Sequence, residues 1–221
     1  MVLVTVALCA MLTFVTSNRA KFTEVSKILA EHGIEVKHAN IALIELQHED
    51  IEYIAKVKAR EAYNVLSNGN NSGDGELEVL VEDDALVIDA LNGFPSIYAS
   101  YVFKSIGNEG ILKLLEGVSN RVAEFLSVIA YFNKCYNEPL TFIGRVSGRI
   151  AYSIRHSVKG LAWGYDPIFI PDGYDMTYAE LYDLNLKCSV SHRRIALDNF
   201  AYWYKHKDNN NSSRVAKQYK Q

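Results

Sequence analysis

The sequence predicts the α/β class, because segments with strand character and segments with helical spacing alternate along the chain. An apolar, β-forming run at residues 12–15 is followed at 19–32 by apolar residues at helical spacing, with Gly33 as a stop. A second strand at 34–42 and a clear amphipathic helix at 50–66 repeat this succession. We therefore expect a mixed, twisted sheet flanked by helices.

The later elements continue the alternation. Residues 78–81 read as a strand that ends at three acids, Glu82, Asp83 and Asp84. The other expected elements are a surface loop at 67–75, a short helix at 109–118, strands at 125–132 and 142–152, and an amphipathic helix at 191–204.

Length and composition favour one large domain. The chain has 221 residues, 49% of them apolar and 22% charged, which suits a protein with a sizeable core. We expect a single domain over residues 1–206 and a disordered polar tail over 207–221. The net charge of −3 attracts neither nucleic acid nor an anionic membrane, so we expect neither as a partner.

The N-terminus and the cysteines bear on localisation. Residues 1–15 are uncharged and apolar, but they lack a cationic start and fall short of the ~18–20 apolar residues of a membrane span. A strand is favoured over a secretory signal. Cys9, Cys135 and Cys188 are far apart, which indicates a reducing compartment without disulfides or structural zinc. We expect a cytoplasmic protein.

Several charged residues oppose the local pattern. Lys58 lies in the middle of the apolar stripe of its helix, so it either reaches to solvent or faces an anion. His192 and Arg193 follow the N-cap residue Ser191 and oppose the helix dipole, unless an anion is bound there. The alternative is that His192 and Arg193 are simply tolerated at solvated surface positions, with no anion bound.

Three further segments suit a phosphate ligand and a base. Residues 16–21 leave backbone N–H groups at a helix start and place Lys21 one turn in, although no P-loop or dinucleotide-binding glycine motif occurs. The acids at 82–84 suit Mg²⁺, or else form a solvated turn. Residues 163–167 (WGYDP) combine a ring that can stack on a nucleobase with a carboxylate, or simply pack in the core. Together these features describe a nucleotide phosphohydrolase.

Five segments in order resemble the inosine triphosphate pyrophosphatase (Ham1-like) family. They are FVTSNRAKFTEV at 14–25, LVEDDALVIDALNGFPSIYASY at 80–101, FIGRVSGRIA at 142–151, WGYDPIFIPDGYDMTYAEL at 163–181 and KCSVSHR at 187–193. The resemblance implies two lobes with a central nucleotide-binding cleft and a homodimer. It also implies Mg²⁺-dependent hydrolysis of ITP, dITP and XTP to the monophosphate and pyrophosphate, with Mn²⁺ as a possible substitute.

The resemblance also implies site roles. Asp83 would be the catalytic base, and Glu45 with Asp83 would hold the metal. The substrate would contact Thr16, Ser17, Asn18, Lys21, Lys58, Asp84, Trp163, Gly164, Tyr165, Asp166, Lys187, His192 and Arg193. Ser17, Asp84 and Ser100 depart from the family pattern, which usually has Gly, a small residue and a cation there.

Two alternatives stay open. A Maf-like pyrophosphatase for pyrimidine or modified nucleotides shares the expected fold, although the SHR and WGYD segments favour purines. A catalytically weak nucleotide-binding protein is the other, with the departures as marks of lost activity.

Overall fold

A computed structural model of the chain describes residues 11–69, 77–160 and 163–207. Its elements are β1 (Met11–Val15), α1 (Arg19–Glu31), β2 (Lys37–Ala39), α2 (Ile51–Gly69), β3 (Leu77–Ile88), η1 (Asp89–Leu91), β4 (Pro95–Ser96), α3 (Ala99–Leu114), β5 (Val122–Phe132), β6 (Leu140–Ile150), β7 (Phe169–Pro171), α4 (Tyr178–Asp183), α5 (Lys187–Val190) and α6 (His192–His206). The succession of strands and helices confirms the predicted class.

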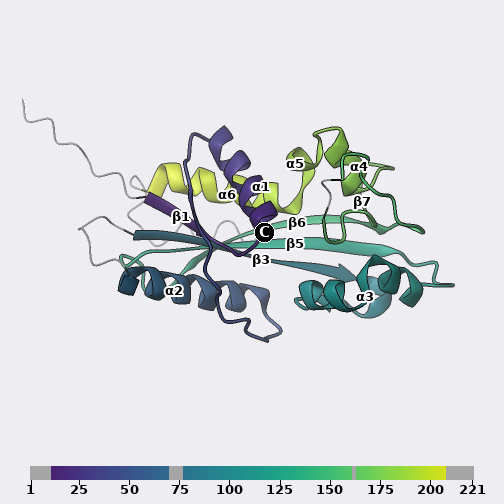
Figure 1. Ribbon diagram of the computed structural model, residues 1–221, viewed down its shortest axis with the longest axis horizontal. Helices are drawn as coiled ribbons and strands as arrows, with labels where there is room; N and C mark the ends of the chain where they lie inside the picture. The colour runs from purple at the N-terminus through teal and green to yellow at the C-terminus, as the bar shows by residue number, and fades with distance from the viewer. Residues whose placement is uncertain (1–10, 70–76, 161–162, 208–221) are drawn as a thin grey trace, which may run out of the picture.

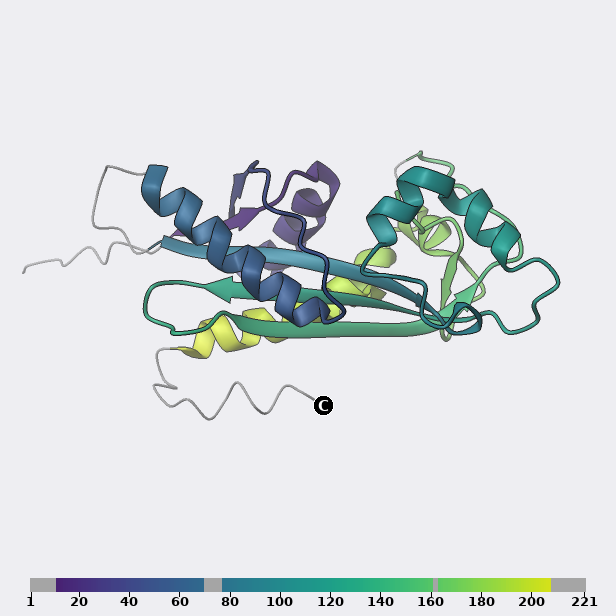
Figure 2. The same ribbon diagram turned by 90° about the horizontal axis from the view of Figure 1, so that it is seen from below.

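One long mixed sheet runs through the molecule in the order β2-β1-β3-β5-β6-β7, and β4 pairs with β3. β1 is parallel to β2 and β3, whereas β3, β5 and β6 are long antiparallel neighbours. α2 and α3 lie on one face of the sheet, and α1 and α6 lie on the other (Figure 1). Seen from below, the helices form two groups towards the two ends of the sheet, which matches the expected pair of lobes (Figure 2).

Three apolar clusters hold the layers together. α1 and α6 pack on one face around Phe14 and Phe200, and α2 packs its alanines on the opposite face beside Val79. The third cluster joins α3, α4 and the far ends of β3 and β5 around Phe125. Burial of these side chains is the main stabilising contribution to the fold.

Two predicted elements had the wrong bounds. The strand expected at 34–42 is only Lys37–Ala39, because β2 is an edge strand whose one partner, β1, ends at Val15. The helix expected at 109–118 begins at Ala99 and is interrupted by Gly107, which has φ 64°. A positive φ is readily adopted by glycine, so the chain bends here without strain.

The predicted end of the strand at 78–81, before the three acids, was also wrong. β3 continues through Glu82, Asp83 and Asp84 to Ile88, paired throughout with β5. Its other edge is covered by β1 up to Leu80 and by β4 from Leu86. Residues 81–85 therefore form a notch in the sheet edge between these two partners, and the acids lie in it.

Some expectations fall outside the described residues. These include residues 1–10, the polar tail from residue 208, and residues 70–75 of the predicted loop, whose first residues, 67–69, belong to α2 instead. The limits of the single domain stay a prediction. Within the described ranges, no helix has both the length and the apolar character needed to cross a membrane.

Candidate active site

A cavity of about 390 Å³ opens at the notch in the β3 edge. It is lined by residues from both groups of helices and from β3. Every site residue predicted from the sequence lines it: Thr16, Ser17, Asn18, Lys21, Glu45, Lys58, Asp83, Asp84, Trp163, Gly164, Tyr165, Asp166, Lys187, His192 and Arg193. The fold therefore brings together segments that are far apart in the sequence.

The strand geometry distributes the three acids. Successive side chains of a strand point to opposite faces, so Glu82 and Asp84 share one face and Asp83 points to the other. The ion pairs follow this alternation, because Lys21 and Arg193 contact Glu82 and Asp84, whereas Lys58 contacts Asp83. The notch thus presents carboxylates to helices on both faces of the sheet.

Lys58 faces an anion rather than solvent. Its Nζ lies 2.7 Å from Asp83 Oδ1 and 3.0 Å from the carboxylate of Glu45. Burial raises the pKa of Asp83 even though the Lys58 ammonium opposes this shift. Asp83 Oδ2 is buried without a hydrogen-bond partner. In the Lys58–Asp83 pair, therefore, one oxygen of Asp83 is bonded to Lys58 and the other, Oδ2, can accept from a ligand.

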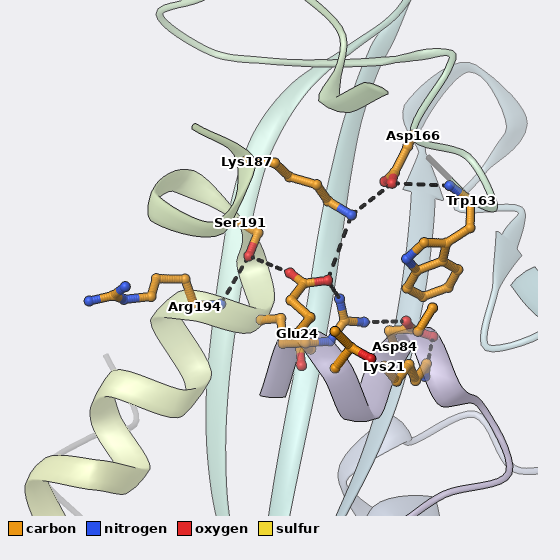
Figure 3. A network of polar contacts seen from close by, with 12 residues as sticks. Lys21, Glu24, Asp84, Trp163, Asp166, Lys187, Ser191 and Arg194 are labelled. Atoms are coloured by element: carbon orange, nitrogen blue, oxygen red, sulfur yellow. Dashed lines mark hydrogen bonds and ion pairs between the residues drawn. The ribbon is translucent and has the colours of Figure 1, made fainter. Parts of the chain in front are cut away.

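Arg193 is held by three carboxylates on the other face. Its guanidinium donates to Glu82 and Glu24 at 2.8 Å each and to Asp84 at 3.0 Å. The predicted anion at the start of α6 is therefore supplied by the protein itself. Lys21 completes the cluster, 3.1 Å from Asp84 (Figure 3).

The helix that carries Lys187 adds a second buried pair. Lys187 Nζ donates to Asp166 at 2.7 Å and lies 3.8 Å from Glu24 (Figure 3). Burial raises the pKa of Asp166, whereas for Glu24 the cations Arg193 and Lys187 outweigh burial and lower the pKa to about 2. A hydrogen-bond donor and acceptor thus stand side by side in the cavity wall.

The 163–166 loop has a defined shape. Gly164 has φ 61°, a conformation that favours glycine, and its carbonyl accepts from Asn108 at 3.1 Å. Tyr165 is buried and donates from its hydroxyl to Ala99 O, so it anchors the loop to α3. The Trp163 ring has the cationic groups of Lys187 and Arg193 5.4 Å from its centroid.

His192 is a buried, neutral ring. It stacks on Phe125 with 4.6 Å between centroids and 7° between planes. Burial, reinforced by Arg193, lowers its pKa well below the ordinary value. Both ring nitrogens lack a hydrogen-bond partner. Such a ring is poised to exchange hydrogen bonds with a ligand, since unpartnered buried polar atoms are costly.

The phosphate cradle expected at residues 16–21 does not have all the free backbone N–H groups that were predicted for it. Asn18 is the N-cap of α1, and its side chain accepts from the amides of Ala20 at 2.9 Å and Lys21 at 3.2 Å. Those two N–H groups are therefore not free for an anion. The Asn18 amide is also engaged, because it donates to Thr16 Oγ1 at 3.1 Å.

Glu45 and Asp83 fit a magnesium ion by donor chemistry. Both offer carboxylate oxygens to one point, now held by Lys58, and Asp83 Oδ2 is unpartnered. Mg²⁺ commonly takes one or two carboxylates and completes its shell with water and substrate phosphates. No group of three or more metal-ligating side chains occurs among residues 11–69, 77–160 and 163–207, so the substrate would have to complete the shell.

Glu24 was not predicted as a site residue, and Glu82 was predicted only as one of three acids that suit Mg²⁺, not as a partner of Arg193. Both are buried carboxylates that hold Arg193. Glu24 precedes Ile28 by four residues and so lies on the apolar stripe of α1, the same signal that singled out Lys58. Glu82 carried no such signal, because it does not interrupt an apolar helix stripe but lies in a run of three acids on β3.

Comparison with known proteins decides the family. The model of the Ham1 family matches residues 12–203. The chain belongs to the Ham1 family. Among its relatives, the dITP/XTP pyrophosphatase of Methanopyrus kandleri is 48% identical over 192 residues, which cover 87% of this chain and 95% of that protein. The dITP/XTP pyrophosphatase of Thermococcus kodakarensis is 41% identical over 88% of this chain and 97% of its own length.

The fold agrees with this family. The solved structure of a HAM1 protein from Coxiella burnetii superposes with a TM-score of 0.73 at 27% identity, over 89% of this chain and 99% of that one. The resemblance read from the five segments is thereby confirmed, as is the expected Ham1 architecture.

Proposed function

We propose that this Ham1 protein hydrolyses dITP, ITP and XTP to the nucleoside monophosphate and pyrophosphate. The observation that carries the proposal is the single cavity in which lysines, carboxylates and the Trp163–Asp166 loop meet. The names and high coverage of the relatives in Methanopyrus kandleri and Thermococcus kodakarensis support it. The Maf-like alternative loses its support, because the family model and these relatives point to the purine-directed family.

We assign selection of the nucleobase to the 163–166 loop and to the first turn of α6. Trp163 stacks on the purine, and Asp166 accepts from its N1–H. His192, with its unpartnered ring nitrogens, donates to the 6-oxo group together with Arg193. Adenine offers the reverse pattern and would leave buried groups unpaired, at about 1–3 kcal/mol for each group.

The phosphate chain is assigned to the lysines. Lys21 and Lys58 neutralise charge on the pyrophosphate leaving group, and Thr16, Ser17 and Asn18 line the same cavity. Each lysine now contacts a carboxylate, so phosphate binding requires an exchange of partners.

Glu45 and Asp83 would hold Mg²⁺, with Mn²⁺ as a substitute. When bound, the ion neutralises phosphate charge and lowers the pKa of a coordinated water. Asp83 accepts the proton of the attacking water at Oδ2, and its raised pKa suits a general base better than an ordinary aspartate. We also propose a homodimer and a cytoplasmic location.

Pyrophosphate release with ITP, XTP, dITP, GTP, ATP and dTTP, with and without Mg²⁺, tests the function. We expect Mg²⁺-dependent turnover of the first three and little of GTP or ATP, and no turnover by Asp83→Asn. Preferred turnover of dTTP would restore the Maf-like alternative. Binding of ITP without turnover would make the protein a nucleotide binder.

A further inference from the structure

Four of the cations that line the cavity, Lys21, Lys58, Lys187 and Arg193, are already paired with carboxylates in the free protein. Lys21 lies 3.1 Å from Asp84, Lys58 lies 2.7 Å from Asp83, and Lys187 lies 2.7 Å from Asp166. Arg193 contacts three carboxylates. An incoming triphosphate therefore competes with the protein's own anions for each of them.

Lys104 differs from these four. It lines the same cavity from α3, is exposed, and has no carboxylate partner within the described part of the chain. Ala99, Ser100 and Phe103 line the cavity beside it, which places all four on one face of the helix. The α3 face thus presents one uncommitted positive charge to the cavity.

α3 is firmly tied to the base-binding loop. The Tyr165 hydroxyl donates to Ala99 O at 2.9 Å, and Asn108 donates to Gly164 O at 3.1 Å. These bonds flank Lys104 on both sides along the helix. α3 lies on the same face of the sheet as α2, which carries Lys58 (Figure 1). Lys104 therefore lies on a helix that is tied to the loop, and it lines the cavity that also holds the Lys58–Asp83 pair.

We propose that Lys104 is a further substrate-binding residue, the cation that engages the phosphate chain without first giving up a carboxylate. The identity of the anion as a nucleoside triphosphate rests on the proposed function. An exposed cation of this kind raises the association rate and lowers KM, and its effect weakens as salt screens it.

Lys104→Gln, Lys104→Arg and Lys113→Gln test the role. Lys113 lies in the last turn of the same helix, is exposed and does not line this cavity, so its variant makes the same charge change elsewhere. We expect Lys104→Gln to lower kcat/KM for ITP about tenfold at low salt, mainly through KM, and less at high salt. The Lys104→Arg and Lys113→Gln variants should both keep the kcat/KM of the wild type. A Lys104→Gln protein with wild-type kcat/KM, or one no weaker than Lys113→Gln, overturns the proposal.

Binding of inorganic tripolyphosphate with Mg²⁺, measured by calorimetry, requires no turnover and separates the two claims. Tenfold weaker binding to Lys104→Gln in a protein that hydrolyses none of the nucleotides would uphold the role of Lys104 and refute the proposed function. If tripolyphosphate binds equally to the wild type and to Lys104→Gln, or does not bind to the wild type, the role of Lys104 is overturned even where ITP is hydrolysed.

Discussion

Lys58 and Glu24 illustrate how a charge on an apolar helix face is accommodated. Each lies among buried apolar residues of its helix, and each finds its counter-charge on a different element: Asp83 on β3 for Lys58, and Arg193 on α6 for Glu24. Because buried charges need a partner, the residue pattern predicts that a partner exists. It does not say which residue the partner is.

At this scale we predict the effect of Lys58→Met. Loss of the ammonium leaves Asp83 buried without its counter-ion, so the pKa of Asp83 rises further. The acid limb of the kcat/KM profile should move to higher pH. The free energy of unfolding should fall by about 1–3 kcal/mol at pH 8 and by less at pH 5, because acid favours the protonated carboxyl of Asp83, which needs no counter-ion.

A pH–rate profile and urea unfolding at the two pH values measure both effects, with Lys58→Arg as the control that keeps the charge. An unchanged acid limb in Lys58→Met would show that Asp83 is not the titrating base.

At the scale of elements, the position of α6 depends on a glycine in β6. A Cβ at Gly144 would lie 2.0 Å from the backbone oxygen of His192 and 2.5 Å from the Ala196 amide nitrogen. α6 can therefore lie directly on β6, and its first turn carries His192 and Arg193 into the cavity.

Gly144→Ala should displace the first turn of α6. Because the obstructing atoms belong to the backbone, we expect the protein to lose about 1–3 kcal/mol of stability. The kcat/KM for ITP should fall more than tenfold, since about 1.4 kcal/mol of lost transition-state binding already gives that factor. Thermal unfolding and kinetics check this, with the exposed Ser147→Ala on the same strand as control. Wild-type kinetics in Gly144→Ala would mean that α6 tolerates the shift.

At the scale of the whole molecule, a buried charge network joins α1, β3, α5 and α6. Its carboxylates and cations are linked through Glu24, Arg193 and Lys187, and neutral His192 is packed against it. Glu24 has a pKa of about 2, below its ordinary 4.5, and His192 has a pKa well below 6.5. In both cases the unfolded chain binds protons more readily, so acid favours unfolding.

The predicted consequence is a two-stage loss of stability as pH falls. The His192 contribution is complete above pH 6.5 and is lost below it, at a rate approaching 1.4 kcal/mol per pH unit. The Glu24 contribution is lost between about pH 4.5 and 2. His192→Phe keeps the stacking on Phe125 and should remove the first stage only. Urea unfolding between pH 8 and 5 measures this. If the free energy of unfolding changed equally steeply with pH in the wild type and in His192→Phe, the prediction would be contradicted.

The elements that could be predicted are those with local signals. The helices α1 and α6 follow from apolar spacing, and the N-cap Ser191 of α6 follows from residue type, whereas the capping role of Asn18 in α1 was not predicted. Most site residues could be named because they lie in short motifs, and Lys58 could be named because it interrupts an apolar helix stripe. The bounds of β2 and the continuation of β3 through its acids could not, because strand pairing with a remote partner outweighs local composition.

The sequence by itself determined the class and the family and pointed to many of the residues that line the cavity, since these depend on neighbours within a helical turn or a motif. Only the tertiary structure decided that Glu82, Asp83 and Asp84 lie in a notch of the sheet edge, and which cation each carboxylate holds. The Glu24–Arg193 contact joins residues separated by 169 positions. Such contacts depend on how the layers pack, and no local pattern encodes that distance.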